Sequence, residues 1–162
     1  MAADPSAPAH PATIDTATDT IEAGTMLEVA AAARDRAYAP YSGFRIGAAV
    51  STTSGEVVAG ALVESVSLGL AMCAERVALF NVVSRGLIPN ALAIVSPRTD
   101  GELTFPCGAC LQVALELVGP DCPVVASDPA GNSAHSTVGA LLTRAPHRHT
   151  YADLVAEATS PG

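Results

Sequence analysis

Two short cysteine motifs constrain this chain more than any other feature. Cys73-Ala74-Glu75-Arg76 and Pro106-Cys107-Gly108-Ala109-Cys110 together supply three thiols, with a glutamate two positions after the first. Three thiolates around a tetrahedral zinc ion leave one coordination position open for water, which is typical of a catalytic site. The motifs therefore predict a zinc site with Glu75 beside it as a general base.

Helical geometry indicates where these residues must lie. Residues three apart on an α-helix are separated by about 60°, so Cys107 and Cys110 can face one ion. Residues two apart diverge by about 200°, so Cys73 and Glu75 would point apart inside a regular helix. We therefore predict that Cys73 precedes the first helical turn, where the helix N-terminus offsets thiolate charge. Arg76 is expected to donate hydrogen bonds to a metal-bound sulfur.

Other interpretations of the cysteines stay open at this point. A lone Cys-x-x-Cys pair can be a thioredoxin-type redox motif, although this leaves Cys73 without a role. A closed structural zinc site would need a fourth ligand, for which His135 and His147 are candidates. Cys122 is a poor candidate, because the helix after Cys110 carries the chain about 12 Å away. It is better explained as a small buried hydrophobe.

The order of the expected elements indicates an α/β fold. Thr25-Met26-Leu27-Glu28 has the form of a capping box and predicts a helix start. Strands alternating with helices predict a three-layer α/β/α domain with a mixed sheet of about five strands. The expected helices run from Thr25 to about Tyr38, from about Cys73 to Arg85 with Gly86 as the stop, and from Cys107 to near Gly119. The expected strands are Phe44 to Val50, Glu56 to Leu62 after a Ser54-Gly55 hairpin turn, Leu92 to Val95, and Pro123 to Ala126.

One folded domain is expected between two tails. Residues 1–20 are rich in Ala, Pro, Thr and Asp and are expected to be disordered. Residues 21–145 should form the domain, and residues 146–162 should be a tail or a short helix. The chain is 49% hydrophobic with 15% charged residues, which suggests that another subunit covers an apolar face.

Charge and hydropathy restrict the partners and the compartment. Eight basic residues against 16 acidic ones give a net charge of −8, which argues against a nucleic-acid polymer and favours a small neutral substrate. No apolar run reaches the roughly 18 residues of a membrane span, and the N-terminus lacks the pattern of a signal peptide. A cytoplasmic protein with reduced thiols is therefore expected.

The two cysteine motifs resemble those of the zinc-dependent cytidine deaminases of the small homotetrameric class. The resemblance extends to three further segments and covers roughly residues 25 to 145. These segments are Tyr38 to Ala48, Ser67 to Leu70, and Leu111 to Val113. Zinc deaminases combine a cysteine ligand set with a glutamate that does not bind the metal. The resemblance therefore implies this fold, zinc as the cofactor, a small nucleoside-like substrate and a homotetramer, with a dimer as the alternative.

The resemblance also implies a role for each matching residue. Glu75 would take a proton from the attacking water, pass it to N3 of a cytosine-type ring, and help to protonate the departing ammonia. The Ala74 backbone would hold the exocyclic amine. Phe44 would pack on the ring, and Glu64 would accept a hydrogen bond from a sugar hydroxyl. Cys73, Cys107 and Cys110 would hold zinc, and Arg76 would support their charge.

The departures from the family pattern fall on the expected substrate contacts. The family carries Asn-x-Glu where this chain has Leu62-Val63-Glu64, and an aromatic where it has Leu68. The arginine usually found after Cys110 is Leu111, and the family's aromatic C-terminal end is replaced by the segment 141–146. One lost hydrogen bond to a sugar hydroxyl weakens binding by about 1 to 3 kcal/mol, and Leu62 with Leu68 predicts a more apolar pocket.

These observations predict a zinc-dependent hydrolase that converts the C4 amine of cytidine or deoxycytidine to a carbonyl. Deamination of another amino-heterocycle, such as a modified cytosine nucleoside, a cytosine-based antibiotic or a free base, is the first alternative. A zinc-binding module without catalysis is the second. The presence of Glu75 argues against that module, because structural zinc needs no adjacent carboxylate.

Overall fold

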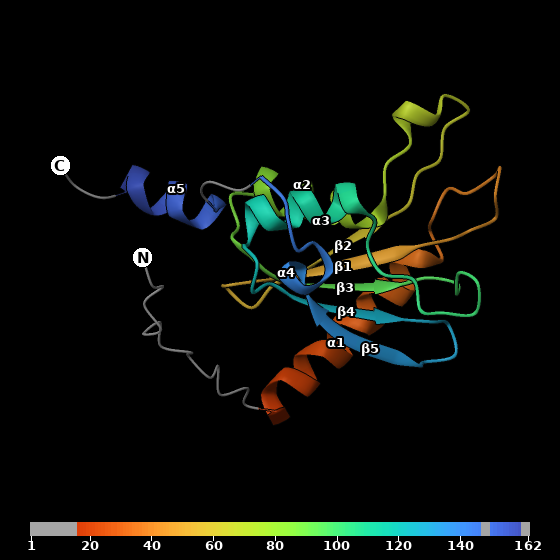
Figure 1. Cartoon of the computed structure of the whole chain (residues 1–162), viewed down its shortest axis with the longest axis horizontal. Helices are drawn as coiled ribbons and strands as arrows, with labels where there is room; N and C mark the ends of the chain where they lie inside the picture. Colours follow the sequence, from red (N-terminus) through yellow and green to blue (C-terminus); the bar gives the residue numbers. More distant parts are fainter. Residues whose placement is uncertain (1–15, 147–149, 160–162) are drawn as a thin grey trace, which may run out of the picture.

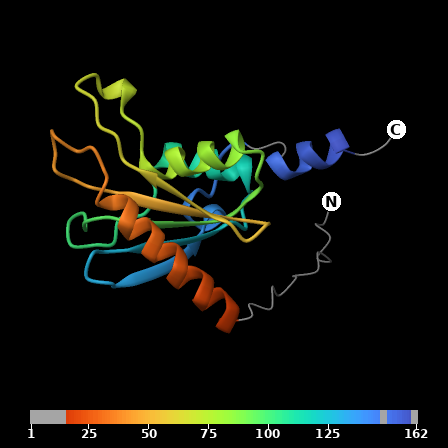
Figure 2. The ribbon, with the colours of Figure 1, turned by 180° about the vertical axis from the view of Figure 1, so that it is seen from behind.

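The computed structural model describes residues 16–146 and 150–159, which form a five-stranded sheet between helices (Figures 1 and 2). The strand order is β2-β1-β3-β4-β5. β3 and β4 are parallel and the other neighbours are antiparallel. The elements are α1 (Thr16–Arg34), β1 (Gly47–Thr52), β2 (Val57–Ala61), the 3-10 helix η1 (Leu68–Leu70), α2 (Ala74–Ser84), β3 (Pro89–Val95), α3 (Gly108–Leu117), β4 (Pro123–Ser127), β5 (Ser133–Thr137), α4 (Val138–Leu141) and α5 (Tyr151–Thr159). The predicted three-layer α/β/α fold with a mixed sheet is confirmed.

Helix α1 covers one face of the sheet (Figure 2). Met26 and Ala30 are buried there together with Ala49 of β1 and Ala93 of β3. The small side chains let the helix approach closely. At Gly47 a Cβ atom would lie 2.0 Å from the Ala30 carbonyl oxygen, so only glycine fits under this helix.

Helices α2 and α3 cover the opposite face and build the larger core. Gly60 of β2 allows α2 to sit directly on the sheet, because a Cβ there would lie 2.2 Å from the Ala74 carbonyl oxygen and 2.5 Å from the Ala78 nitrogen. This contact fixes the N-terminal turn of α2. The core side chains are those of Ala48, Val50, Val58, Ala78, Leu79, Val82, Leu92, Ile94, Leu111, Ala114, Leu115, Cys122, Val124, Ala126 and Val138.

The predicted end of the second helix is confirmed. Gly86 has φ +70° and donates its N–H to the Val83 carbonyl at 3.0 Å, while Leu87 donates to Val82 at 3.1 Å. This pair of hydrogen bonds is the Schellman motif, which ends a helix at a left-handed residue. The buried, hydrophobic role predicted for Cys122 is also confirmed, since it is 3% exposed in the core.

The predicted bounds of the first helix are wrong. Helix α1 begins at Thr16, so Thr25 lies inside it and residues 16–20, expected in the tail, are helical. The chain from residue 16 contains no proline before Thr25, and the one glycine only weakens a helix. The helix also ends at Arg34 and not near Tyr38, because the backbone of Tyr38 pairs with Leu62 and Glu64. Residues 1–15 of the predicted tail lie outside the described residues.

Two other boundaries differ from the predictions. β1 begins at Gly47, so Phe44 lies in an extended segment before the strand. The fifth strand, which the sequence pattern had not located, is β5, paired antiparallel with β4. The C-terminal stretch contains the short helix α5. Within the described ranges, no helix combines the length and the apolar character needed to cross a bilayer.

Candidate metal centre

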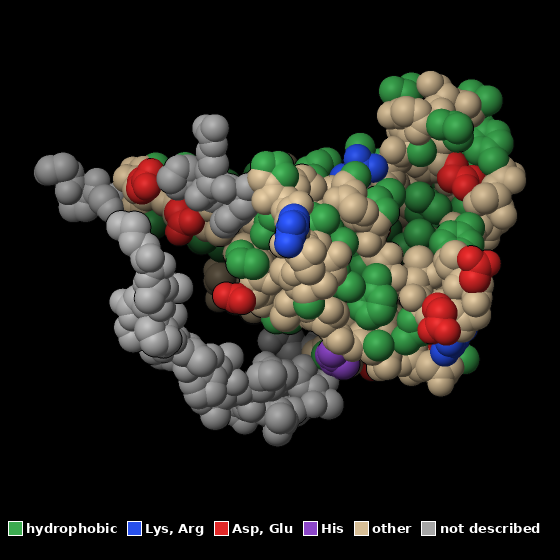
Figure 3. All heavy atoms as spheres, in the orientation of Figure 1, with side chains coloured by type: hydrophobic (Ala, Val, Ile, Leu, Met, Phe, Trp, Pro, Cys, Tyr) green, Lys and Arg blue, Asp and Glu red, His purple; other side chains and the backbone are tan. Residues whose placement is uncertain are grey.

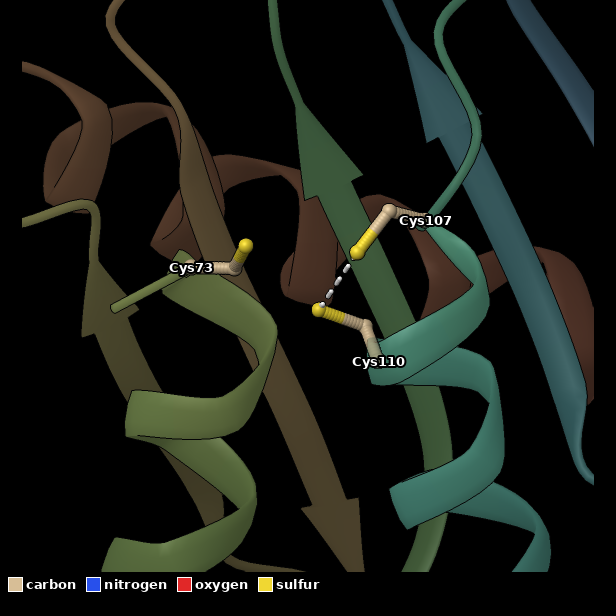
Figure 4. A group of neighbouring side chains, drawn as sticks. All are labelled: Cys73, Cys107 and Cys110. Atoms are coloured by element: carbon tan, nitrogen blue, oxygen red, sulfur yellow. Dashed lines mark hydrogen bonds between the residues drawn. The ribbon is translucent and has the colours of Figure 1, made fainter. Parts of the chain in front are cut away.

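The three cysteines of the two motifs meet at the first turns of α2 and α3 (Figure 4). Cys73 is the N-cap of α2 with φ −65° and ψ 147°, and Cys107 is the N-cap of α3 with φ −68° and ψ 164°. Cys110 follows in the first turn of α3. The prediction that Cys73 precedes the helical backbone is confirmed, and both helix N-termini point toward the sulfurs.

The sulfur atoms are close enough to share one ion. All three lie within 4.8 Å of one another, and the Cys107 and Cys110 sulfurs are 3.5 Å apart. Zinc–sulfur bonds of about 2.3 Å in a tetrahedron place sulfurs about 3.8 Å apart. Cys110 is buried, Cys73 is half-buried and Cys107 is exposed. The donor set therefore fits zinc, with three protein ligands and a fourth position available.

Hydrogen bonds within the cluster favour a thiolate at Cys73. The Cys110 thiol donates to Cys73 and lowers its pKa to about 5, and Arg76 contributes further. The Arg76 Nη2 atom is 3.7 Å from the Cys73 sulfur. The same hydrogen bond, together with burial, raises the pKa of Cys110. The thiolate is the form of cysteine that binds metal. The cluster therefore favours the binding of a cation, which replaces the protons of the remaining thiols.

Glu75 is buried beside the cysteines, with 3% of its surface exposed. Burial raises the pKa of its carboxyl group above the ordinary value, and the nearby Cys73 charge raises it further. Its Oε2 atom has no hydrogen-bond partner among the described residues. A buried carboxyl oxygen without a partner costs free energy unless water or a ligand meets it. The unpaired oxygen therefore indicates that a bound molecule completes this site.

Three further segments lie next to one another beside Cys73. Tyr38 pairs with Val63 and Val63 with Met72, forming a set of short backbone pairs that we call the three-segment ladder. Val63 and Met72 exchange two hydrogen bonds of 3.0 and 2.9 Å. Because Cys73 directly follows Met72, the ladder holds the chain just before this metal ligand, and α2 begins just after it.

Glu64 leaves the ladder and contacts the segment that contains Phe44. Its carboxylate accepts hydrogen bonds from the Tyr41 and Ser42 amides at 2.9 and 3.3 Å and a short one from the Ser42 hydroxyl. The Ser42 hydroxyl hydrogen bond is the main cause that lowers the pKa of Glu64. Phe44 is half-buried, and its N–H donates to the Ser42 oxygen at 2.9 Å. The role of Ser42 was not predicted, since its partner lies 22 positions away in the sequence.

The segment that leads to Cys107 is held by Asp128, another residue without a predicted role. Arg98 donates to the Asp128 carboxylate at 2.8 Å and to the Gly101 carbonyl at 2.8 Å. The hydrogen bond from the Asn132 side chain, followed by that from Arg98, lowers the pKa of Asp128 to about 2. The carboxylate therefore fixes the loop between β3 and α3.

The residues that depart from the family pattern occupy different environments. Leu111 belongs to α3, is 5% exposed and packs in the core between this helix and the sheet. Leu62 is half-buried directly after β2. Leu68 is 87% exposed in η1 of the single chain, and the more apolar pocket predicted from Leu62 and Leu68 stays a prediction. The loop around η1 projects from the domain (Figure 1).

The comparison with protein families agrees with this geometry. Residues 21–127, more than half of the chain, match the model of the cytidine and deoxycytidylate deaminase zinc-binding region. A cytidine deaminase of Halalkalibacterium halodurans is 40% identical over 117 residues, which are 72% of this chain and 88% of that protein. A probable cytidine deaminase of Dictyostelium discoideum is 36% identical over 132 residues, 82% of this chain and 86% of that protein.

Solved structures agree in fold and in sequence. The cytidine deaminase of Burkholderia pseudomallei superposes with a TM-score of 0.71 at 43% identity, over 76% of this chain and 98% of that one. Among the relatives compared by sequence alone, a blasticidin-S deaminase of Bacillus cereus is 29% identical over 87 residues, 49% of this chain and 61% of that protein. The family match, the close relatives and the three-cysteine cluster lead to one conclusion. The chain belongs to the cytidine and deoxycytidylate deaminase family and is a zinc-dependent aminohydrolase.

Proposed function

We propose that the protein hydrolyses the C4 amine of cytidine or deoxycytidine to a carbonyl and releases ammonia. The observation that carries this proposal is the unpaired Oε2 atom of Glu75, buried beside three sulfurs that leave a fourth metal position open. A site that only held zinc for stability would gain nothing from an adjacent buried carboxyl group. The cytidine deaminases among its relatives further support the proposed substrate.

The ligands of the metal are assigned from the cluster. Cys73, Cys107 and Cys110 would hold zinc, which would lower the pKa of a water molecule toward 7 and supply hydroxide at neutral pH. Arg76 and the two helix N-termini offset part of the negative charge of the sulfurs. We infer that this reduction keeps the metal electrophilic.

Glu75 is assigned as the group that moves protons. Its carboxylate would accept a proton from the attacking water and deliver it to N3 of the ring. It would then carry the proton of the new C4 hydroxyl to the amine, which leaves as ammonia as the carbonyl forms. Burial raises the pKa of Glu75, which brings it closer to the neutral range in which one group can both accept and donate a proton efficiently. Its Oε2 atom has no partner in the part of the chain that the structure describes, so this atom can contact water and substrate.

Three residues are assigned to the substrate. Phe44 would pack on the pyrimidine ring, and the Ala74 backbone at the start of α2 would hold the exocyclic amine. The Glu64 carboxylate has about four acceptor positions and uses three of them for the Tyr41 and Ser42 donors. We assign the remaining position to a sugar hydroxyl.

The site is proposed to be completed in an oligomer. Val66, Leu68 and Leu70 are 82%, 87% and 74% exposed on the loop beside the site, and Figure 3 shows apolar side chains gathered on this projection. Exposed apolar patches of this kind favour contact with another subunit. We propose a homotetramer, with a dimer as the alternative, acting in the cytoplasm on a small molecule and not on a nucleic-acid polymer.

A second candidate substrate is another amino-heterocycle. Leu62 stands where the family has an asparagine, so one hydrogen bond to a ribose hydroxyl is not available from this position. The 29% identical relative is named a blasticidin-S deaminase. A modified cytosine nucleoside, a cytosine-based antibiotic or a free base is therefore the alternative substrate class.

Ammonia release from purified protein of measured zinc content tests the function. The panel would contain cytidine, deoxycytidine, cytosine, 5-methylcytidine and blasticidin S, with chelator-treated protein as the control. Turnover of cytidine or deoxycytidine that disappears on chelation and returns with zinc is expected. Zinc-dependent turnover of another member alone would establish the alternative substrate class. Full zinc occupancy without turnover of any member would contradict the proposal and favour a zinc-binding module.

A further inference from the structure

Ser42 is held between Glu64 and Phe44 by two hydrogen bonds. Its hydroxyl donates to Glu64 Oε1 and its oxygen accepts the Phe44 N–H at 2.9 Å. A serine hydroxyl has one proton to donate. Because this proton points to Glu64 in a hydrogen bond, the direction of the hydroxyl is fixed and a lone pair of its oxygen faces the Phe44 N–H. Ser42 thus transmits the position of the carboxylate to the backbone of the aromatic residue.

The same carboxylate anchors the rest of the turn. Glu64 Oε2 accepts the amides of Tyr41 and Ser42 at 2.9 and 3.3 Å. The Gly43 backbone has φ +69° and its N–H donates to the Ala39 carbonyl at 3.1 Å. Residues 42–46 belong to no helix or strand, so these hydrogen bonds supply the order that a sheet would otherwise provide.

Glu64 is itself tied to the metal centre. It directly follows the Val63 step of the three-segment ladder, and its N–H donates to the Tyr38 carbonyl at 2.8 Å. Cys73 directly follows the Met72 step of the same ladder. A short path therefore leads from Cys73 to the adjacent Met72, across the hydrogen bonds to Val63, and from the adjacent Glu64 through Ser42 to Phe44.

We propose that Ser42 is a positioning residue that fixes the Phe44 ring relative to the metal centre. The proposal rests on the proposed function, in which Phe44 packs on the pyrimidine ring. In this proposal, Glu64 strengthens substrate binding mainly through its hydrogen bond with Ser42, and to a smaller extent through a hydrogen bond with a sugar hydroxyl. A misplaced ring weakens ground-state and transition-state binding alike, so KM changes and kcat does not.

Single substitutions at Ser42 test this role. Ser42→Ala is expected to raise KM for cytidine about tenfold, the equivalent of one charge-assisted hydrogen bond, while kcat and zinc content stay close to those of the unchanged protein. Ser42→Thr retains the hydroxyl and is expected to restore most of the lost affinity. Ser84→Ala is the matched control, because it removes an exposed hydroxyl that donates to the Asn81 carbonyl at the end of α2, away from the cysteine cluster. An unchanged KM in Ser42→Ala would overturn the proposal.

A second substrate distinguishes the contribution of the sugar hydroxyls to binding from that of the pyrimidine ring. With 2′,3′-dideoxycytidine, which lacks the 2′ and 3′ hydroxyls, Ser42→Ala should raise KM by the same factor as with cytidine, and Glu64→Gln should retain most of the effect that it has with cytidine. The double variant should resemble either single variant, because both remove one connected set of hydrogen bonds. A Glu64→Gln effect seen only with cytidine, or additive effects in the double variant, would show that Glu64 acts on the sugar and would overturn the proposal.

Amide hydrogen exchange tests the positioning without any substrate. The Tyr41, Ser42 and Phe44 amides should be protected in the unchanged protein and should exchange at least about tenfold faster in Ser42→Ala and Glu64→Gln, since each loses its acceptor or the group that orders it. Equal exchange in all three proteins would overturn the proposal. If the unchanged zinc protein turned over no cytosine compound, the proposed function would fail, and this measurement would still decide the role of Ser42.

Discussion

The two sides of the site are built in different ways. The metal side consists of side chains at the first turns of two helices that are packed against the sheet, where Cys110 and Glu75 are buried, Cys73 is half-buried and Cys107 is exposed. The proposed substrate side consists of residues in irregular segments, held by side-chain hydrogen bonds to one carboxylate. The helices are fixed by the whole core, whereas the irregular segments depend on a few polar contacts. In the proposed function, the chemistry lies on the part that the core fixes, and substrate choice lies on the part that can change at a small cost in stability.

The largest expected effect comes from the metal side. Glu75→Gln should lower kcat by about 10³-fold, because the amide cannot accept and return a proton. Zinc content and the melting temperature should remain close to those of the unchanged protein, since the two side chains are nearly equal in size. Turnover and zinc analysis on the same preparation check this.

Glu102→Gln is the matched control for that experiment, because Glu102 is an exposed residue in the loop between β3 and α3. It should keep full activity. A Glu75→Gln protein that retained substantial turnover would contradict the assigned proton transfer.

An intermediate effect is expected where the sheet supports the metal side. Gly60→Ala would bring a methyl group to within 2.2 Å of the Ala74 carbonyl oxygen, so α2 must shift away from β2. The free energy of unfolding should fall by about 1 to 3 kcal/mol, and zinc should bind more weakly because Cys73 moves with the helix. Chemical denaturation and zinc titration measure the two effects.

Gly24→Ala makes the same substitution where no atom lies within 4 Å. Within α1 it should raise the free energy of unfolding by up to about 1 kcal/mol. Equal stabilities of the two variants would mean that the close packing of α2 on β2 is not required.

The smallest effect is expected on the substrate side. Leu62→Asn should improve kcat/KM for cytidine by about tenfold if a ribose hydroxyl lies beside the end of β2, because one buried hydrogen bond is gained. The fold and zinc content should not change. Parallel assays with cytidine and 2′,3′-dideoxycytidine isolate the contribution of the sugar hydroxyls. An equal change in kcat/KM for both substrates would show that no sugar hydroxyl lies beside residue 62.

The metal side could be predicted from the sequence because its geometry is local. Cys107 and Cys110 are one helical turn apart, and Cys73 had to be an N-cap for its sulfur to reach them, as the structure confirms. The arrangement of Ser42 and Glu64 could not be predicted, since it depends on residues 22 positions apart that only the folded chain brings together. The error at Thr25 has a similar origin, because a capping box marks a helix start only if the preceding residues are not helical.

The backbone pair between Val63 and Met72 closes the loop around η1 at its base, and so separates this loop from the metal ligand Cys73 that follows it. The loop of residues 65–71 leaves and returns through that pair, so a change in its length or composition is absorbed before it reaches Cys73. Surface loops closed in this way tolerate insertions at a low entropic cost. A loop from a relative, inserted between Val63 and Met72, should therefore alter substrate or subunit recognition while Cys73 stays in place. This loop can thus vary between family members, or be redesigned, without a change in the metal centre.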